Sequence, residues 1–190
     1  MHPQRADRVR FDGVADPLLL TRLRAGDCGA LETLLDRHWA AVYRYASRRT
    51  RSTETGASLA QSVFCSLWER RASWDDAVSA RALLFRLARA APLRRDRGGE
   101  RGDRCNDSMA LDCDPGATIA SSETSRLCAA IRGVAATLHP RQREVFLLRV
   151  LDGLSYDEIA AVLLISGEIV AAELGEGLAT MQSLLGPRLD

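Results

Sequence analysis

Arginine is the residue type in this chain with the clearest potential for chemistry. All 26 basic residues are arginines, and a planar guanidinium binds phosphate or carboxylate through two parallel hydrogen bonds. The absence of lysine has a second explanation, a GC-rich coding bias, and the count alone favours that bias. The distribution of charge along the chain is more informative than the count. Residues 1–97 hold 18 Arg and 11 acidic residues, whereas residues 98–190 hold 8 Arg and 14 acidic residues. A front half of net charge +7 suits a polyanionic partner, and a back half of −6 does not.

Residues for catalysis or metal binding are not gathered in any recognisable pattern. Asp75 and Asp76 are the nearest approach to paired carboxylates, but they lie in the polar segment WDDAVSA, where a solvated turn is the better interpretation. Phosphate-binding loops, nucleophile elbows and zinc-protease motifs are absent. The five cysteines form no CxxC pair and the three histidines are scattered, so we expect no metal and no cofactor. The chain is therefore not expected to be an enzyme.

The elements that position the arginines are predicted to be helices. Apolar residues recur at helical spacing from Cys28 to about Arg49, and RALLFRLARAA over 81–91 places its arginines outside an apolar stripe. Asp16 before Pro17 is typical of a helix cap, and Asp27 of a second one. We expect a break from Thr53 to Gly56, between the second helix and the next.

The back half begins a new domain after a charged, glycine-rich segment. We expect an all-α fold of two small helical domains joined by a flexible linker: a loose N-terminus over 1–15, a first domain over 16–97, the linker over 98–122 and a second domain over 123–190. No apolar run reaches the roughly 18 residues of a membrane span. The N-terminus shows no apolar secretory segment. Cytoplasmic localisation without membrane insertion is the expectation.

The second domain has the pattern of a helix-turn-helix. Pro140 opens one helix, Gly153 fits the cap at its end, and Ser155 with Glu158 forms a capping box for the next. Ser166 is placed to cap the last helix. That helix, 167–185, contains no basic side chain and carries three glutamates, so its outward face lacks the donors that bind phosphates and guanine edges.

The segment RQREVFLLRVLDGLSYDEIAAVLLIS resembles region 4 of sigma-70-type RNA polymerase sigma factors, in particular the extracytoplasmic-function (ECF) class. In the front half, ALETLLDRHWAAVYRYASRR, ASLAQSVFCSLWERRASWDD and ARALLFRLARAAPLRRDR resemble region 2 in order and spacing. The resemblance implies binding to core RNA polymerase, opening of the −10 promoter element by region 2 and recognition of the −35 element by region 4. Family members commonly carry basic residues where this chain has Ala171, Glu173, Gly175 and Glu176, which implies weakened −35 recognition.

The resemblance also assigns residues to each partner. DNA contacts from the region 2-like domain would come from Arg81, Arg86, Arg89, Arg94, Arg95 and Arg97. Weak DNA contacts from the region 4-like domain would come from Arg141, Arg143, Arg149 and Ser166. Polymerase contacts would come from residues on or under one helix, Leu59, Gln61, Phe64 and Trp68.

Two functions remain open at this point. One is a transcription initiation factor that directs core polymerase to promoter DNA, with an anti-sigma factor as a further candidate partner. The other is a sigma-like interaction module whose acidic last helix binds an anti-sigma factor or another protein instead of DNA, since a shared fold does not fix the function. The basic front half favours the first and the charge of the last helix favours the second.

Overall fold

The computed structural model describes residues 13–74, 78–92, 133 and 135–185. Every regular element in these residues is helical and none is a strand, which confirms the all-α prediction. No helix in the described ranges is long and apolar enough to cross a membrane. The predicted linker over 98–122 and Arg94, Arg95 and Arg97 lie outside the described residues.

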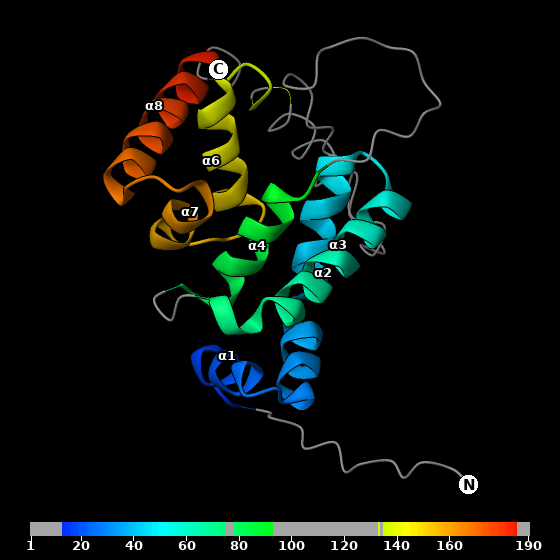
Figure 1. The fold of residues 1–190 in the computed structure, drawn as a ribbon. Coiled ribbons are helices and arrows are strands. Elements are labelled where there is room, and N and C mark those ends of the chain that lie inside the picture. The colour runs from blue at the N-terminus through cyan, green and yellow to red at the C-terminus, as the bar shows by residue number, and fades with distance from the viewer. Residues whose placement is uncertain (1–12, 75–77, 93–132, 134, 186–190) are drawn as a thin grey trace, which may run out of the picture.

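The helices form two groups along the chain (Figure 1). The N-terminal group consists of α1 (Asp16–Arg24), α2 (Cys28–Thr50), α3 (Thr53–Glu69), the short 3-10 helix η1 (Arg71–Ser73) and α4 (Ala80–Ala90). The C-terminal group consists of α6 (Pro140–Val150), α7 (Tyr156–Leu163) and α8 (Gly167–Leu185). Below, these groups are called the N-terminal half and the C-terminal half.

Several helix starts follow the local sequence signals. The Asp27 side chain accepts a hydrogen bond from the backbone N–H of Gly29 at 2.9 Å, so it caps α2 as predicted. Pro140 is the first residue of α6. The capping box of α7 is complete, because Ser155 accepts from the Glu158 N–H and the Glu158 carboxylate accepts from the Ser155 N–H.

Two local predictions were wrong. Asp16 does not cap α1; it is the first helical residue, and its carboxylate instead pairs with Arg37 at 2.8 Å and His38 at 2.6 Å on α2. The expected break from Thr53 to Gly56 is helical, since α3 starts at Thr53 with Ser52 as its cap. Gly56 is there for space rather than for a turn, because α2 approaches its Cα closely.

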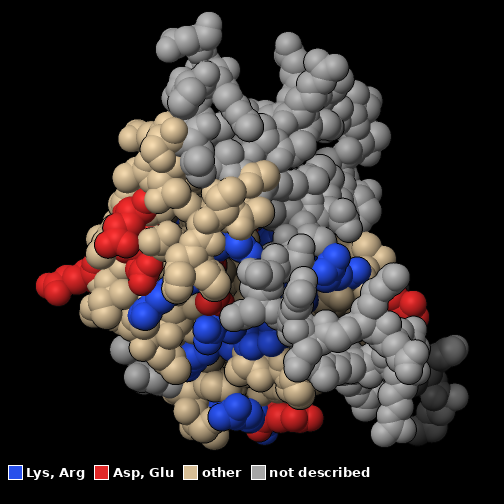
Figure 2. Space-filling model, turned by 90° about the horizontal axis from the view of Figure 1, so that it is seen from above, with Lys and Arg blue, Asp and Glu red and all other residues tan. Residues whose placement is uncertain are grey.

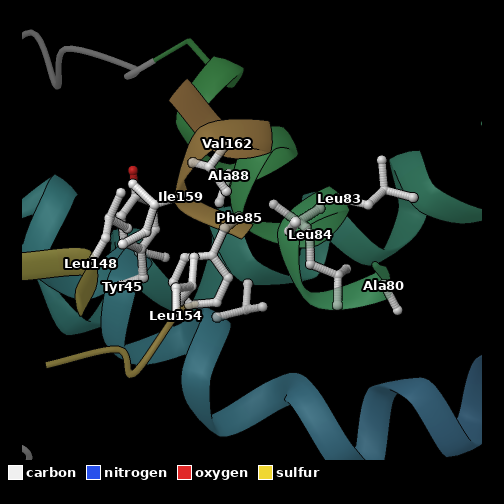
Figure 3. Close-up of a cluster of buried hydrophobic side chains, with 14 of the residues drawn as sticks. Tyr45, Ala80, Leu83, Leu84, Phe85, Ala88, Leu148, Leu154, Ile159 and Val162 are labelled. Atoms are coloured by element: carbon white, nitrogen blue, oxygen red, sulfur yellow. The ribbon is translucent and has the colours of Figure 1, made fainter. Parts of the chain in front are cut away.

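The two halves share one apolar interior (Figure 3). Helix α4 packs against α7, and it also packs on α2 and α3. Phe85 of α4 lies beside Tyr45 of α2, with ring centroids 5.1 Å apart. Leu154 and Ile159 from the C-terminal half are fully buried in the same cluster. The C-terminal half is therefore seated directly on the helix that was predicted to bind DNA.

Candidate nucleic-acid interface

Helix α4 carries the arginines that were expected to face promoter DNA. Its start is fixed by Ser79, whose hydroxyl accepts from the Ala82 N–H at 3.1 Å. Its apolar side is buried, and it includes Leu83, Leu84 and Phe85. The end of the helix is held by α2, because Arg49 donates to the carbonyl oxygens of Ala88 and Ala91 at 2.7 and 2.9 Å.

Two of the predicted DNA-binding arginines on α4 point into the C-terminal half. Arg81 donates to the backbone carbonyl oxygens of Asp152 and Gly153 in the turn between α6 and α7. Arg89 forms an ion pair with Glu144 of α6, with its Nε 2.7 Å from one carboxylate oxygen and Nη2 3.4 Å from the other. The hydrogen bond to Glu144 is the main reason that the pKa of Arg89 is raised above its ordinary value. Neither guanidinium has all its donors available to a phosphate in this arrangement.

Arg86 differs from its two neighbours on the helix. It is half-buried, and it makes no hydrogen bond or ion pair with any residue in the described ranges. It is therefore the α4 arginine that keeps its donors unoccupied within the described part of the chain.

A buried ion pair that the sequence did not suggest joins the halves beside α4. Nη2 of Arg48 on α2 lies 2.5 Å from a carboxylate oxygen of Asp152, and the two side chains are 9% and 1% exposed. Burial raises the pKa of Asp152, although the positive charge of Arg48 and its hydrogen bond oppose that rise. The sequence offers only a weak signal for this pair, because an Asp before Gly153 is more typical of an exposed turn.

A second cross-contact lies at the start of α4. The Ser79 hydroxyl is 3.0 Å from Oε1 of Glu158, the residue that completes the α7 capping box. Ser79, Arg81 and Arg89 thus all contact the C-terminal half, at the beginning, first turn and last turn of α4.

The arginines predicted to bind DNA from the C-terminal half are occupied too. Arg143 is buried and donates to the carbonyl oxygens of Ala135, Ala136 and Leu138, so these donors are not free for a phosphate, and its DNA contact stays a prediction. Arg149 donates to the Leu154 carbonyl at 2.8 Å and lies over the ring of Tyr156. Ser166 accepts from the Ile169 N–H at 3.4 Å, at the start of α8.

Two of the three acidic side chains of α8 contact residues of α6. Glu173 pairs with Arg141 at 3.4 Å, and Glu176 accepts from Nε2 of Gln142 at 3.0 Å. In Figure 2 acidic side chains gather at the left edge, the side on which Figure 1 places α8. The Glu173 carboxylate offsets part of the Arg141 charge, which lowers the attraction of Arg141 for a DNA phosphate.

The residues predicted to contact polymerase divide between the surface and the interior of α3. Leu59 and Phe64 are buried, and Phe64 packs against Trp39 with ring centroids 6.0 Å apart. Gln61 is exposed, and Trp68 is half-buried under the guanidinium of Arg71. This matches their expected placement on or under one helix, while contact with polymerase stays a prediction.

Metal-ligating residues do not converge within the described ranges, where no group of three or more His, Cys, Asp or Glu side chains could hold an ion. Cys28 and Cys65 are exposed free thiols. Asp75 and Asp76 lie outside the described residues. The arrangement as a whole is suited to binding through charge and helix packing.

Comparisons with known proteins found a matching family model and similar solved structures. Residues 128–185, which include α6, α7 and α8, match the family model described as Sigma-70, region 4. The structure of CnrH in complex with the cytosolic domain of CnrY contains a chain with the same fold, at a TM-score of 0.64 and 22% identity over 92% of this chain and 99% of that one. A chain of the RsbN–BldN complex also matches, at a TM-score of 0.34 and 23% identity over 87% and 99%. No curated protein sequence shows significant similarity.

Proposed function

We propose that this chain is a transcription initiation factor of the ECF sigma class. Its residues 128–185 match the region 4 model, and 92% of the chain aligns with a chain of the CnrH–CnrY complex. The observation that carries the proposal is the region 4 match over 128–185. The order of helices before it and the basic N-terminal half support the same conclusion. The chain acts in the cytoplasm by binding and has no catalytic step of its own.

In this proposal each half has a separate task. The exposed face of α3 around Gln61 binds core polymerase, and the arginines of α4 with Arg94, Arg95 and Arg97 bind the −10 region by displacing counterions from phosphates. Region 4 contributes little −35 recognition, because α8 offers glutamates where base and phosphate contacts need donors.

The decisive experiment is capture of core polymerase by the purified chain, followed by run-off transcription from a promoter library. Promoter-dependent transcripts are expected only when the chain is present. Gln61→Arg should weaken core binding, whereas the matched control Gln182→Arg, also an exposed helical glutamine, should leave it unchanged. Absence of both core binding and transcripts would refute the proposal.

Weak −35 recognition has its own test. Glu173→Arg with Glu176→Arg should raise affinity for duplex DNA and steepen its salt dependence, since each new phosphate contact adds about 0.9 to the slope. An unchanged slope would mean that this face of α8 never meets DNA.

A second function is favoured by the charge of α8 alone. The three glutamates of α8 suit a basic protein surface better than DNA. The matching structure of CnrH was solved in complex with a protein, the cytosolic domain of CnrY. A chain that binds such a regulator, for example an anti-sigma factor, but neither core polymerase nor promoter DNA would have this second function.

A further inference from the structure

The last turn of α4 is followed by a proline that cannot continue its hydrogen bonds. In an α-helix each N–H donates to the carbonyl oxygen four positions earlier, so the carbonyl of Ala88 requires the N–H of residue 92. That residue is Pro92, which has no N–H. The helix ends at Ala90, and Ala91 before the proline is extended, with φ −63° and ψ 133°. The helix itself therefore provides no donor for the Ala88 carbonyl.

Arg49 of α2 provides the donor that Pro92 lacks. A single nitrogen of its guanidinium, Nη1, lies 2.7 Å from the Ala88 oxygen and 2.9 Å from the Ala91 oxygen. Both acceptors are carbonyls at the C-terminal end of α4, where the helix dipole also favours a positive charge. Arg49 thus completes the end of α4 from another helix, across the contact between α2 and α4.

The position at which α4 ends decides how the arginines after it are presented. Three arginines that were predicted to bind DNA follow Pro92 within five positions: Arg94, Arg95 and Arg97. In a continued helix, successive side chains would point about 100° apart around one axis, whereas an extended residue at Ala91 turns the chain away from that axis. A change in the end of α4 therefore moves these arginines relative to those on the helix.

We propose that Arg49 is a positioning residue for nucleic-acid binding. By holding the Ala88 and Ala91 carbonyls it fixes the end of α4, and with it the direction in which the arginines beyond Pro92 reach DNA. Arg49 acts through these carbonyls and needs no contact with DNA itself. The inference rests on the proposed function of the arginines on and after α4 as DNA-binding residues.

The test compares the full wild-type chain with variants at two positions. Pro92→Ala restores an N–H for the Ala88 carbonyl and removes the block to a longer helix, while it keeps every positive charge. Arg49→Met removes both hydrogen bonds but retains an apolar stem, and Arg49→Lys places one nitrogen near the position of Nη1. Fluorescence anisotropy measures affinity for a labelled single-stranded oligonucleotide, and urea denaturation followed by circular dichroism measures stability.

The matched control is Arg51→Met, which removes the same charge two positions away. Arg51 is exposed, and its side chain makes no hydrogen bond or ion pair with any residue that the structure describes. Loss of one exposed charge should leave the affinity within about threefold of wild type.

Pro92→Ala is expected to bind the oligonucleotide about tenfold more weakly than wild type without loss of stability. This factor corresponds to one charge-assisted contact that is no longer made. Arg49→Met should weaken binding by about the same factor. Arg49→Lys should restore most of the affinity, because one nitrogen makes both hydrogen bonds in wild type.

Wild-type affinity in Pro92→Ala overturns the proposal, because the end of α4 would then not affect DNA binding. Arg49→Met that binds no more weakly than Arg51→Met also overturns it, since charge alone would explain the loss. If Arg49→Met loses helical content, the other two variants decide. Weak binding by Pro92→Ala with near wild-type binding by Arg49→Lys supports the proposal, and any other combination overturns it.

Failure of this inference differs from failure of the proposed function. If wild type supports transcription with core polymerase, and Pro92→Ala binds the oligonucleotide as wild type does, the sigma function holds and the positioning role is wrong. If the variants lose oligonucleotide binding that wild type has, yet no form binds core polymerase, the positioning role holds and the sigma function is wrong. A wild-type chain that binds no oligonucleotide overturns the positioning role, and capture of core polymerase then decides the function.

Discussion

Replacing Gly56 with alanine tests the close approach of α2 and α3. A Cβ atom at Gly56 would lie 2.4 Å from Oγ of Ser47, 2.6 Å from its Cα and 2.8 Å from its backbone nitrogen. Rotation of the Ser47 side chain relieves only the first of these contacts. The other two involve the backbone of α2, so the helices themselves must separate by nearly 1 Å before ordinary van der Waals contact returns.

Two effects of opposite sign decide the outcome. Alanine gains roughly 0.5–1 kcal/mol over glycine within a helix, whereas forcing a group into a packed interior costs about 1–3 kcal/mol. Because the obstruction is backbone, we expect the upper end of that range and a net loss of about 2 kcal/mol in the free energy of unfolding. Urea denaturation followed by circular dichroism measures it.

Gly175→Ala is the matched control, because Gly175 also lies inside a helix but a Cβ there meets nothing within 4 Å. It should stabilise the protein by roughly 0.5–1 kcal/mol through helix propensity alone. If Gly56→Ala proves as stable as wild type while the control behaves as expected, the two helices are not packed as closely as described.

Three further substitutions probe other parts of the fold. Leu154→Ala should reduce the free energy of unfolding by about 2–5 kcal/mol, since it empties a fully buried site between the halves; a loss below 1 kcal/mol in urea denaturation would argue against a shared interior. Ser155→Ala removes the α7 cap and should cost about 1 kcal/mol, measured by thermal melting against the neighbouring exposed Asp157→Ala. Leu164 is 73% exposed with a φ of 56°, so Leu164→Gly should stabilise by roughly 1 kcal/mol, and a lowered melting temperature would contradict this.

Local signals in the sequence predicted the start of a helix correctly where neighbouring residues alone fix that start. Asp27, Pro140 and the Ser155–Glu158 box behave as predicted because each is satisfied within a few residues. Local signals gave a wrong prediction at Asp16, because its partners Arg37 and His38 lie 21 and 22 residues away on another helix. It failed at Gly56 because glycine was interpreted as a break and not as a means of close packing.

At the candidate site, the sequence predicted the helix but not the contacts of its side chains. The helical character of 81–91 and its arginines could be predicted from spacing. The contacts of those arginines could not be predicted, because Arg81 and Arg89 are separated from Asp152 and Glu144 by 71 and 55 positions and nothing local links them. The periodicity of α4 also leaves open whether its apolar face covers one half of the chain or both. The structure, by placing Phe85 between them, provides this information.

The position of Arg143 is one that lysine could not fill. A guanidinium reaches three backbone carbonyls there at once, and a single ammonium group on a flexible stem cannot reproduce that flat, forked arrangement. Exchange to lysine at 143 would leave buried acceptors without donors, whereas the exposed Arg141 could exchange at little cost to folding. Replacement of arginine by lysine would therefore be tolerated on the surface of the C-terminal half but opposed where Arg143 is buried.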